Sequence, residues 1–241
     1  VGGEGRNRHA AKVAQERRFK DYRSDLILDI RHIKLALKGL RQLSRIGAED
    51  ELDLEETIDE TCKNAGEIEL IFKRSRKNAA KVLLLMDVGG SMDPFALLCS
   101  RLFTAAHASA HFKDLQFYYF HNCVYDHVYT NAMMYEGMST DYLINTLPPD
   151  YKVIFVGDAR MATSELTHKN GIINYYMRND LPGILWLKKF ADHFTHTVWL
   201  NPEEMYYWNH PTVMMINKMF SMYPLTVDGI SDAVKKLIVK K

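Results

Sequence analysis

Apolar residues in the first third of the chain recur at helical spacing. The recurring positions are Ile30, Ile33, Leu37, Leu40 and Leu43. Steps of three and four residues place these side chains on one helix face, so the pattern predicts an amphipathic helix over residues 27–46. Asp53 and Glu56 have the spacing of a capping box, which predicts a second helix near residues 54–65.

From residue 67 onward, short apolar runs and amphipathic segments alternate. Predicted strands cover residues 67–72, 81–86, 115–120, 124–129, 151–156, 197–200 and 225–227. Predicted helices begin at Asp93-Pro94 and cover residues 140–147, 182–193, 212–222 and 231–239. The continuous apolar run at residues 81–86 is typical of a strand that is buried on both faces. This alternation predicts an α/β fold, with a doubly wound, mostly parallel sheet and helices on both faces.

The same pattern suggests two parts. Residues 1–78 are expected to form a basic helical arm, amphipathic helices and an edge strand, and residues 79–241 the α/β domain. Basic residues gather at Arg6, Arg8, Lys12, Arg17, Arg18, Lys20 and Arg23, with only Glu16 and Asp21 among them. Such a segment is either a solvated basic helix or a contact arm for an acidic partner.

Composition limits the function classes. The 241 residues include 31 Lys plus Arg and 30 Asp plus Glu, a net charge of +1, so the chain is no global polycation and no specific nucleic-acid partner is predicted. Three cysteines without a CxxC pair indicate a reducing compartment. No apolar run approaches the length of a membrane span, and the polar first residues do not resemble a secretory signal, so a cytoplasmic location is expected.

Candidate chemistry lies where predicted strands end. Asp87 follows the first buried strand, and Asp158 follows the strand at residues 151–156. Ser91 and Thr140 lie in loops that open helices. Ligands of open α/β sheets bind beyond the carboxyl ends of the strands, and carboxylate and hydroxyl oxygens suit Mg²⁺ or Mn²⁺. With so few charges, such a site would keep an open position, which a partner's Asp or Glu carboxylate could fill.

These residues carry a family resemblance. Asp87-x-Gly89-x-Ser91, Thr140 in a Gly-x-Ser-Thr-Asp loop and Asp158 in Ile-Phe-Val-Gly-Asp resemble the metal-ion-dependent adhesion site of von Willebrand factor A (VWA) domains. Flanking segments resemble the CoxE-like branch of that family over residues 52–241. They are Leu54-Glu55-Glu56-Thr57, Gly66-Glu67, the basic run at residues 73–77, Thr197-Val198-Trp199-Leu200-Asn201-Pro202 and His210-Pro211-Thr212.

The resemblance implies a non-enzymatic binding module that works through a divalent ion and is paired with a MoxR-type AAA+ ATPase in protein maturation or remodelling. Ser91 and Thr140 would offer hydroxyls to the metal, and Asp87 and Asp158 would supply charge. The family has Ser where this chain has Gly89, so one oxygen ligand is missing. A water could replace that oxygen at reduced affinity, or the site could hold no ion, with Asp87 and Ser91 capping the following helix.

Several alternatives remain open at this stage. Met92, Met133, Met134 and Met138 would form either an adaptable apolar rim for a partner or part of the core. A metal-independent interaction scaffold is one alternative function. A Mg²⁺-dependent phosphoester hydrolase that uses Asp87 and Asp158 is the other, although Gly89 stands where a phosphatase has its second Asp. The chain matches neither a P-loop nor a nucleophile elbow.

Overall fold

The computed structural model describes residues 29–41, 43–109, 112–173 and 178–239. The main sheet contains β3 (Lys81–Asp87), β4 (Asp114–Phe120), β5 (His127–Tyr129), β6 (Gly137–Ser139), β7 (Lys152–Val156), β8 (His196–Asn201) and β9 (Ser221–Pro224). Their order across the sheet is β6-β5-β4-β3-β7-β8-β9. Five neighbouring strands are parallel to one another: β4, β3, β7, β8 and β9. The strands β5 and β6 form an antiparallel edge beside β4. The predicted α/β fold with a mostly parallel sheet is confirmed.

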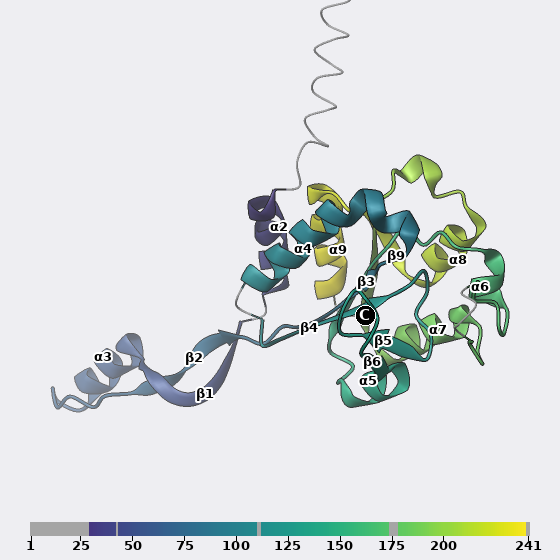
Figure 1. Ribbon diagram of the computed structural model, residues 1–241. Helices are drawn as coiled ribbons and strands as arrows, with labels where there is room; N and C mark the ends of the chain where they lie inside the picture. The colour runs from purple at the N-terminus through teal and green to yellow at the C-terminus, as the bar shows by residue number, and fades with distance from the viewer. Residues whose placement is uncertain (1–28, 42, 110–111, 174–177, 240–241) are drawn as a thin grey trace, which may run out of the picture.

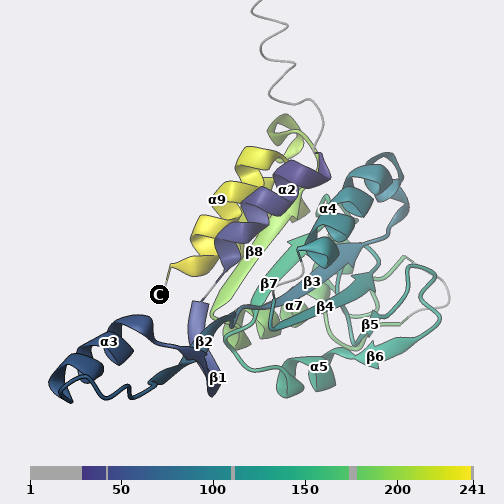
Figure 2. The ribbon, with the colours of Figure 1, turned by 90° about the vertical axis from the view of Figure 1, so that its left-hand side faces the viewer.

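Helices cover both faces of this sheet (Figures 1 and 2). One face carries α2 (Ile30–Leu37), α4 (Ala96–Ala108) and α9 (Val227–Ile238), and the other carries α5 (Thr140–Thr146), α6 (Thr163–Thr167), α7 (Gly183–His193) and α8 (Pro211–Met219). Side chains of β3 alternate between the two cores: Leu83 and Leu85 enter one, and Leu84 and Met86 enter the other. The central strands are therefore buried on both sides, as their apolar runs predicted.

The predicted helix over residues 27–46 is wrong in its second half. The α-helix α2 ends at Leu37, a 3₁₀ turn covers Lys38–Leu40, and β1 (Leu43–Leu52) begins soon afterwards. Gly39 permits a close approach here, because a Cβ on it would lie 2.7 Å from Val234 Cγ1 of α9. Leu43 matches the helical spacing by coincidence, and strand pairing with a distant segment determines its structure.

The edge strand predicted at residues 67–72 is also wrong. The strand β2 covers Phe72–Asn78 and pairs with β1 in a separate two-stranded antiparallel sheet, so it is not an edge of the main sheet. Acidic residues on β1 face the basic start of β2, with Glu49 opposite Arg74. This pairing of opposite charges favours the hairpin. Figures 1 and 2 show the hairpin projecting from the main body as an arm.

The helix predicted near residues 54–65 is confirmed as α3 (Leu54–Lys63), at the end of this arm. The Asp53 side chain caps it by accepting from the Glu56 backbone N–H at 3.4 Å. Lys73 Nζ lies 2.9 Å from Asp53 Oδ2, which ties β2 to the start of the helix. Gly66 then adopts a φ of +94°, a conformation that favours glycine after a helix end.

The last elements begin earlier than predicted. The strand expected at residues 225–227 is β9, Ser221–Pro224, and the helix expected at residues 231–239 is α9, which begins at Val227. Thr226 explains the early start, because its hydroxyl accepts from the Gly229 backbone N–H at 3.1 Å and caps the helix. Short elements are the other misses: the sequence patterns predict neither β6 nor α6, and the strand predicted from residue 124 starts at His127.

The N-terminal residues that the structure describes bear on the predicted division into two domains. The basic segment at residues 6–24 lies outside the described residues. Ile33, Leu37 and Leu40 are buried in the same core cluster as strands β3, β7 and β8. The division between residues 78 and 79 stays a prediction. No helix in the described ranges is long and apolar enough to cross a membrane.

Candidate functional site

Asp87 is the last residue of β3, the central strand of the main sheet. Its side chain is buried, with only 4% of the residue exposed. The oxygen Oδ1 accepts two backbone hydrogen bonds, from Gly89 N–H at 2.8 Å and Asn122 N–H at 2.9 Å. The other oxygen, Oδ2, is buried and receives no hydrogen bond from any described residue. Burying a carboxylate oxygen without a partner costs folding free energy. A cation or a proton at this atom would remove that cost.

The surroundings of Asp87 favour its neutral form when no cation is present. Burial raises the pKa of Asp87 to about 7, and the negative charges of Asp158 and Glu165 add to the increase. The backbone hydrogen bonds from Gly89 and Asn122 lower the pKa, but they do not offset the loss of hydration. A bound cation would favour the charged form.

Asp158 lies in the loop after β7, next to β3 at the carboxyl edge of the sheet. It is 1% exposed, and its Oδ1 accepts from the Arg160 backbone N–H at 2.8 Å. Ala159 follows with a φ of +58°, an unfavourable conformation for a residue with a Cβ. The surrounding structure must therefore hold this loop in place.

Three side chains brace that loop by donating to three successive backbone carbonyls. The donors are Trp199 Nε1 to Gly157 O (2.7 Å), Asn201 Nδ2 to Asp158 O (2.9 Å) and Thr212 Oγ1 to Ala159 O (2.8 Å). All three donor residues are buried. The segments at residues 197–202 and 210–212 thus serve to position the loop that carries Asp158.

The two hydroxyl residues of the predicted site have different environments. Ser91 is exposed in the 3₁₀ turn Gly90–Phe95, which follows the Asp87 loop. Thr140 is fully buried at the start of α5, and its hydroxyl donates to the Tyr125 carbonyl at 2.6 Å. Within the described part of the chain, no hydrogen bond joins either hydroxyl to Asp87 or Asp158. The four-ligand set stays a prediction.

The described residues contain no group of three or more His, Cys, Asp or Glu side chains that could hold a metal ion. The described residues therefore do not form a tight metal cage of charged side chains. The donors present, a carboxylate oxygen without a partner and neutral oxygens around it, fit a divalent ion that keeps several waters.

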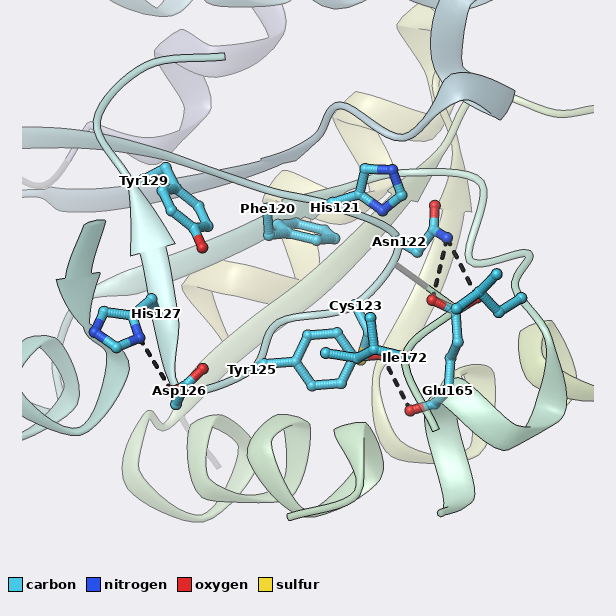
Figure 3. A pocket seen from close by; sticks show the side chains of 11 residues that line it. Phe120, His121, Asn122, Cys123, Tyr125, Asp126, His127, Tyr129, Glu165 and Ile172 are labelled. Atoms are coloured by element: carbon cyan, nitrogen blue, oxygen red, sulfur yellow. Dashed lines mark hydrogen bonds and ion pairs between the residues drawn. The ribbon is translucent and has the colours of Figure 1, made fainter. Parts of the chain in front are cut away.

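Two further residues, Asn122 and Glu165, connect to Asp87 although no sequence pattern indicates them. Asn122 follows β4 with a φ of +58°, and its side-chain Nδ2 donates to both Glu165 carboxylate oxygens, at 3.4 and 3.3 Å (Figure 3). Glu165 is 2% exposed and also accepts from the Ala162 backbone N–H at 3.3 Å. In the parallel register Asp87 pairs with Phe120, so Gly89 and Asn122 each lie two residues past paired positions, a relationship that the sequence alone does not show.

A cleft of about 300 Å³ opens beside Asn122 and Glu165 (Figure 3). Its lining includes Asp126 and His127, whose side chains lie 3.1 Å apart, and the exposed Ile173. No Lys or Arg side chain lines this cleft in the part of the chain that the structure describes. The cleft presents hydrogen-bonding and acidic groups beside Asn122, whose backbone N–H donates to Asp87.

The four methionines of the predicted rim occupy different positions. Met92 is 4% exposed, whereas Met133 is 73% exposed. Met134 and Met138 are half-buried, and Met138 packs against the core. Only Met133 therefore presents most of its side chain to solvent, and the contact rim stays a prediction.

Comparisons with known proteins place part of the chain. Residues 26–137 match the model of a family described as "VWA domain containing CoxE-like protein". The matched range includes Asp87, Gly89, Ser91 and Asn122, and it ends before Thr140 and Asp158. No curated protein and no solved structure matches the chain.

Proposed function

The chain contains a VWA domain of the CoxE-like family, matched over residues 26–137, and we propose that it is a protein-binding module that uses a divalent cation at Asp87. The observation that carries the proposal is the buried Oδ2 of Asp87, which has no partner among the described residues. A cation would neutralise this carboxylate where hydrogen-bond donors do not. VWA domains are general interaction modules, which agrees with a binding role.

Mg²⁺ or Mn²⁺ is the proposed ion, because both prefer oxygen ligands and tolerate retained water. Asp87 would hold the ion, Ser91 and Thr140 would offer hydroxyl oxygens, and Asp158 would act directly or through water. When bound, the ion supplies an open coordination position for an incoming oxygen. The partner group we propose is an Asp or Glu carboxylate on the surface of another protein.

The partner we propose is a MoxR-type AAA+ ATPase, with the present chain acting as its adaptor in protein maturation or remodelling. We propose no catalytic role. The residues argue against a phosphoester hydrolase, because Gly89 offers no second carboxylate after Asp87.

Co-purification with a MoxR-type ATPase from the same genome tests this function. The tagged chain should retain the ATPase in Mg²⁺ and release it in EDTA, and the isosteric variant Asp87→Asn should fail to retain it in either buffer. Retention in EDTA would favour a metal-independent scaffold. Hydrolysis of generic phosphoesters that requires Mg²⁺ and disappears in Asp87→Asn would favour the hydrolase and contradict the proposal.

A further inference from the structure

The space beside Gly89 is filled by an oxygen from another strand end. A Cβ built on Gly89 would overlap Asn122 Oδ1, and it would lie 3.2 Å from Asp87 Oδ1. A side chain at position 89 and the Asn122 amide therefore compete for one volume, directly beside the Asp87 carboxylate. No described residue donates a hydrogen bond to Asn122 Oδ1, so its lone pairs are available.

We propose that Asn122 Oδ1 supplies the metal-ligating oxygen that Gly89 cannot supply. The inference rests on the proposed divalent-cation site at Asp87 and identifies one of its ligands. An amide oxygen is a neutral, hard donor of the kind that Mg²⁺ and Mn²⁺ accept. Asn122 lies after β4 and not in the Asp87 loop, so the ligand would come from a second strand end.

Glu165 fixes which end of the Asn122 amide faces Gly89. An amide NH₂ group can donate to a carboxylate and an amide oxygen cannot, so Nδ2 must face the two Glu165 oxygens (Figure 3). The oxygen Oδ1 then points to the opposite side, toward the space beside Gly89. Glu165 itself is buried and held by the Ala162 N–H, so it is a positioning residue for Asn122.

The backbone of Asn122 strengthens the connection to Asp87. Its N–H donates to Asp87 Oδ1, while its φ of +58° is a conformation that Asn adopts more readily than most residues. One residue thus orients the carboxylate through its backbone and places a second oxygen beside that carboxylate through its side chain. Both features require the same left-handed turn.

The decisive measurement is the Mn²⁺ affinity by calorimetry of four proteins: wild type, Asn122→Gly, Gly89→Ser and the double variant. Glycine at position 122 keeps the N–H, tolerates the positive φ and removes the amide, while it also adds backbone freedom. We expect Asn122→Gly to weaken Mn²⁺ binding by about tenfold or more, as expected when a ligand or its support is lost. The double variant should recover most of this loss, because a Ser side chain at position 89 then fits beside Asp87 and restores an oxygen.

Asn170→Gly is the matched control. Asn170 also has a positive φ, +54°, but it is exposed in the loop after α6. This substitution should leave Mn²⁺ affinity within about twofold of wild type. A change as large as that of Asn122→Gly would mean that the effect comes from backbone freedom, which would overturn the proposal.

Thermal unfolding without metal provides a second readout. Gly89→Ser should lower the melting temperature because its side chain collides with Asn122 Oδ1, and adding Asn122→Gly should restore it. If the two substitutions changed the melting temperature additively, the side chain at position 89 and the Asn122 amide would not compete for one volume. That result would overturn the inference.

The outcomes separate this inference from the proposed function. If the wild type binds Mn²⁺ and Asn122→Gly binds it equally or more tightly, Asn122 is not a ligand. The proposed metal site itself would then still stand. A folded wild type that binds no Mn²⁺ would overturn the metal site and the ligand role together.

Discussion

The indole nitrogen of Trp199 donates to the carbonyl oxygen of Gly157 at a distance of 2.7 Å. This bond joins the middle of β8 to the first residue of the loop that carries Asp158. Asn201 and Thr212 continue the contact at the next two carbonyls. Groups separated by more than forty residues in the sequence therefore hold one carboxylate loop at the carboxyl edge of the sheet.

Removing one of these donors should destabilise the protein. Thr212→Val keeps the shape of the side chain but leaves the buried Ala159 carbonyl without its hydrogen bond, at a cost of about 1–3 kcal/mol in the free energy of unfolding. Chemical denaturation measures this change. Thr104→Val is the matched control, because Thr104 is exposed on α4 and bonds only to its own helix. Equal effects of the two substitutions would contradict the bracing role.

The raised pKa of Asp87 predicts a pH-dependent cost in metal-free protein. The folded-state value is about 7 and the ordinary value is 3.8, so the folded chain holds a proton that the unfolded chain releases between these values. The contribution of this carboxyl to stability is thus fully present below about pH 4 and is lost as the pH rises to about 7.

Asp87→Asn removes this titration while keeping the shape of the side chain. In EDTA, its stability relative to wild type should increase between about pH 4 and pH 8, by roughly 1–4 kcal/mol. Denaturation at a series of pH values measures the difference, from which the other titrating groups largely cancel. A difference that stays constant with pH would show that Asp87 is charged throughout the range.

The first described helix should be essential for the stability of the main body. Leu37 is 3% exposed within the core of α4, α9 and the sheet, whereas Leu35 on the same helix is 68% exposed. Leu37→Ala should lower the free energy of unfolding by about 2–5 kcal/mol, and Leu35→Ala should change it by less than about 0.5 kcal/mol. Similar values for the two variants would mean that α2 does not pack on the body in solution.

Local patterns predicted the central sheet well because its strands are buried on both faces. Runs such as residues 82–86 and 153–156 are continuous and apolar, and the helices between them have one apolar face. The fold class follows from these segments. The patterns failed at Leu43, where helical spacing coincides with a strand, and at β2, which pairs with the distant strand β1. Pairing between distant segments has no short-range signature.

The candidate site likewise contains residues that the sequence predicts and residues that only the structure reveals. Asp87 and Asp158 could be selected from sequence because each follows an apolar strand directly. Asn122 could not be selected from spacing alone, since its role depends on the turn after β4, the φ of +58° and the buried Glu165 opposite it. Gly89 was identified as a departure from the family pattern. That another residue occupies the space it leaves is a tertiary fact.

The proposed cation site at Asp87 is tested most directly by a calorimetric titration with Mg²⁺ and Mn²⁺. The wild-type chain and the Asp87→Asn variant are titrated side by side. Metal binding should displace the proton that Asp87 holds near neutral pH, so the affinity should increase as the pH rises through about 7. We expect about one ion per wild-type chain and none in the variant. A folded wild-type protein that binds neither ion at about pH 8 would contradict the proposed site.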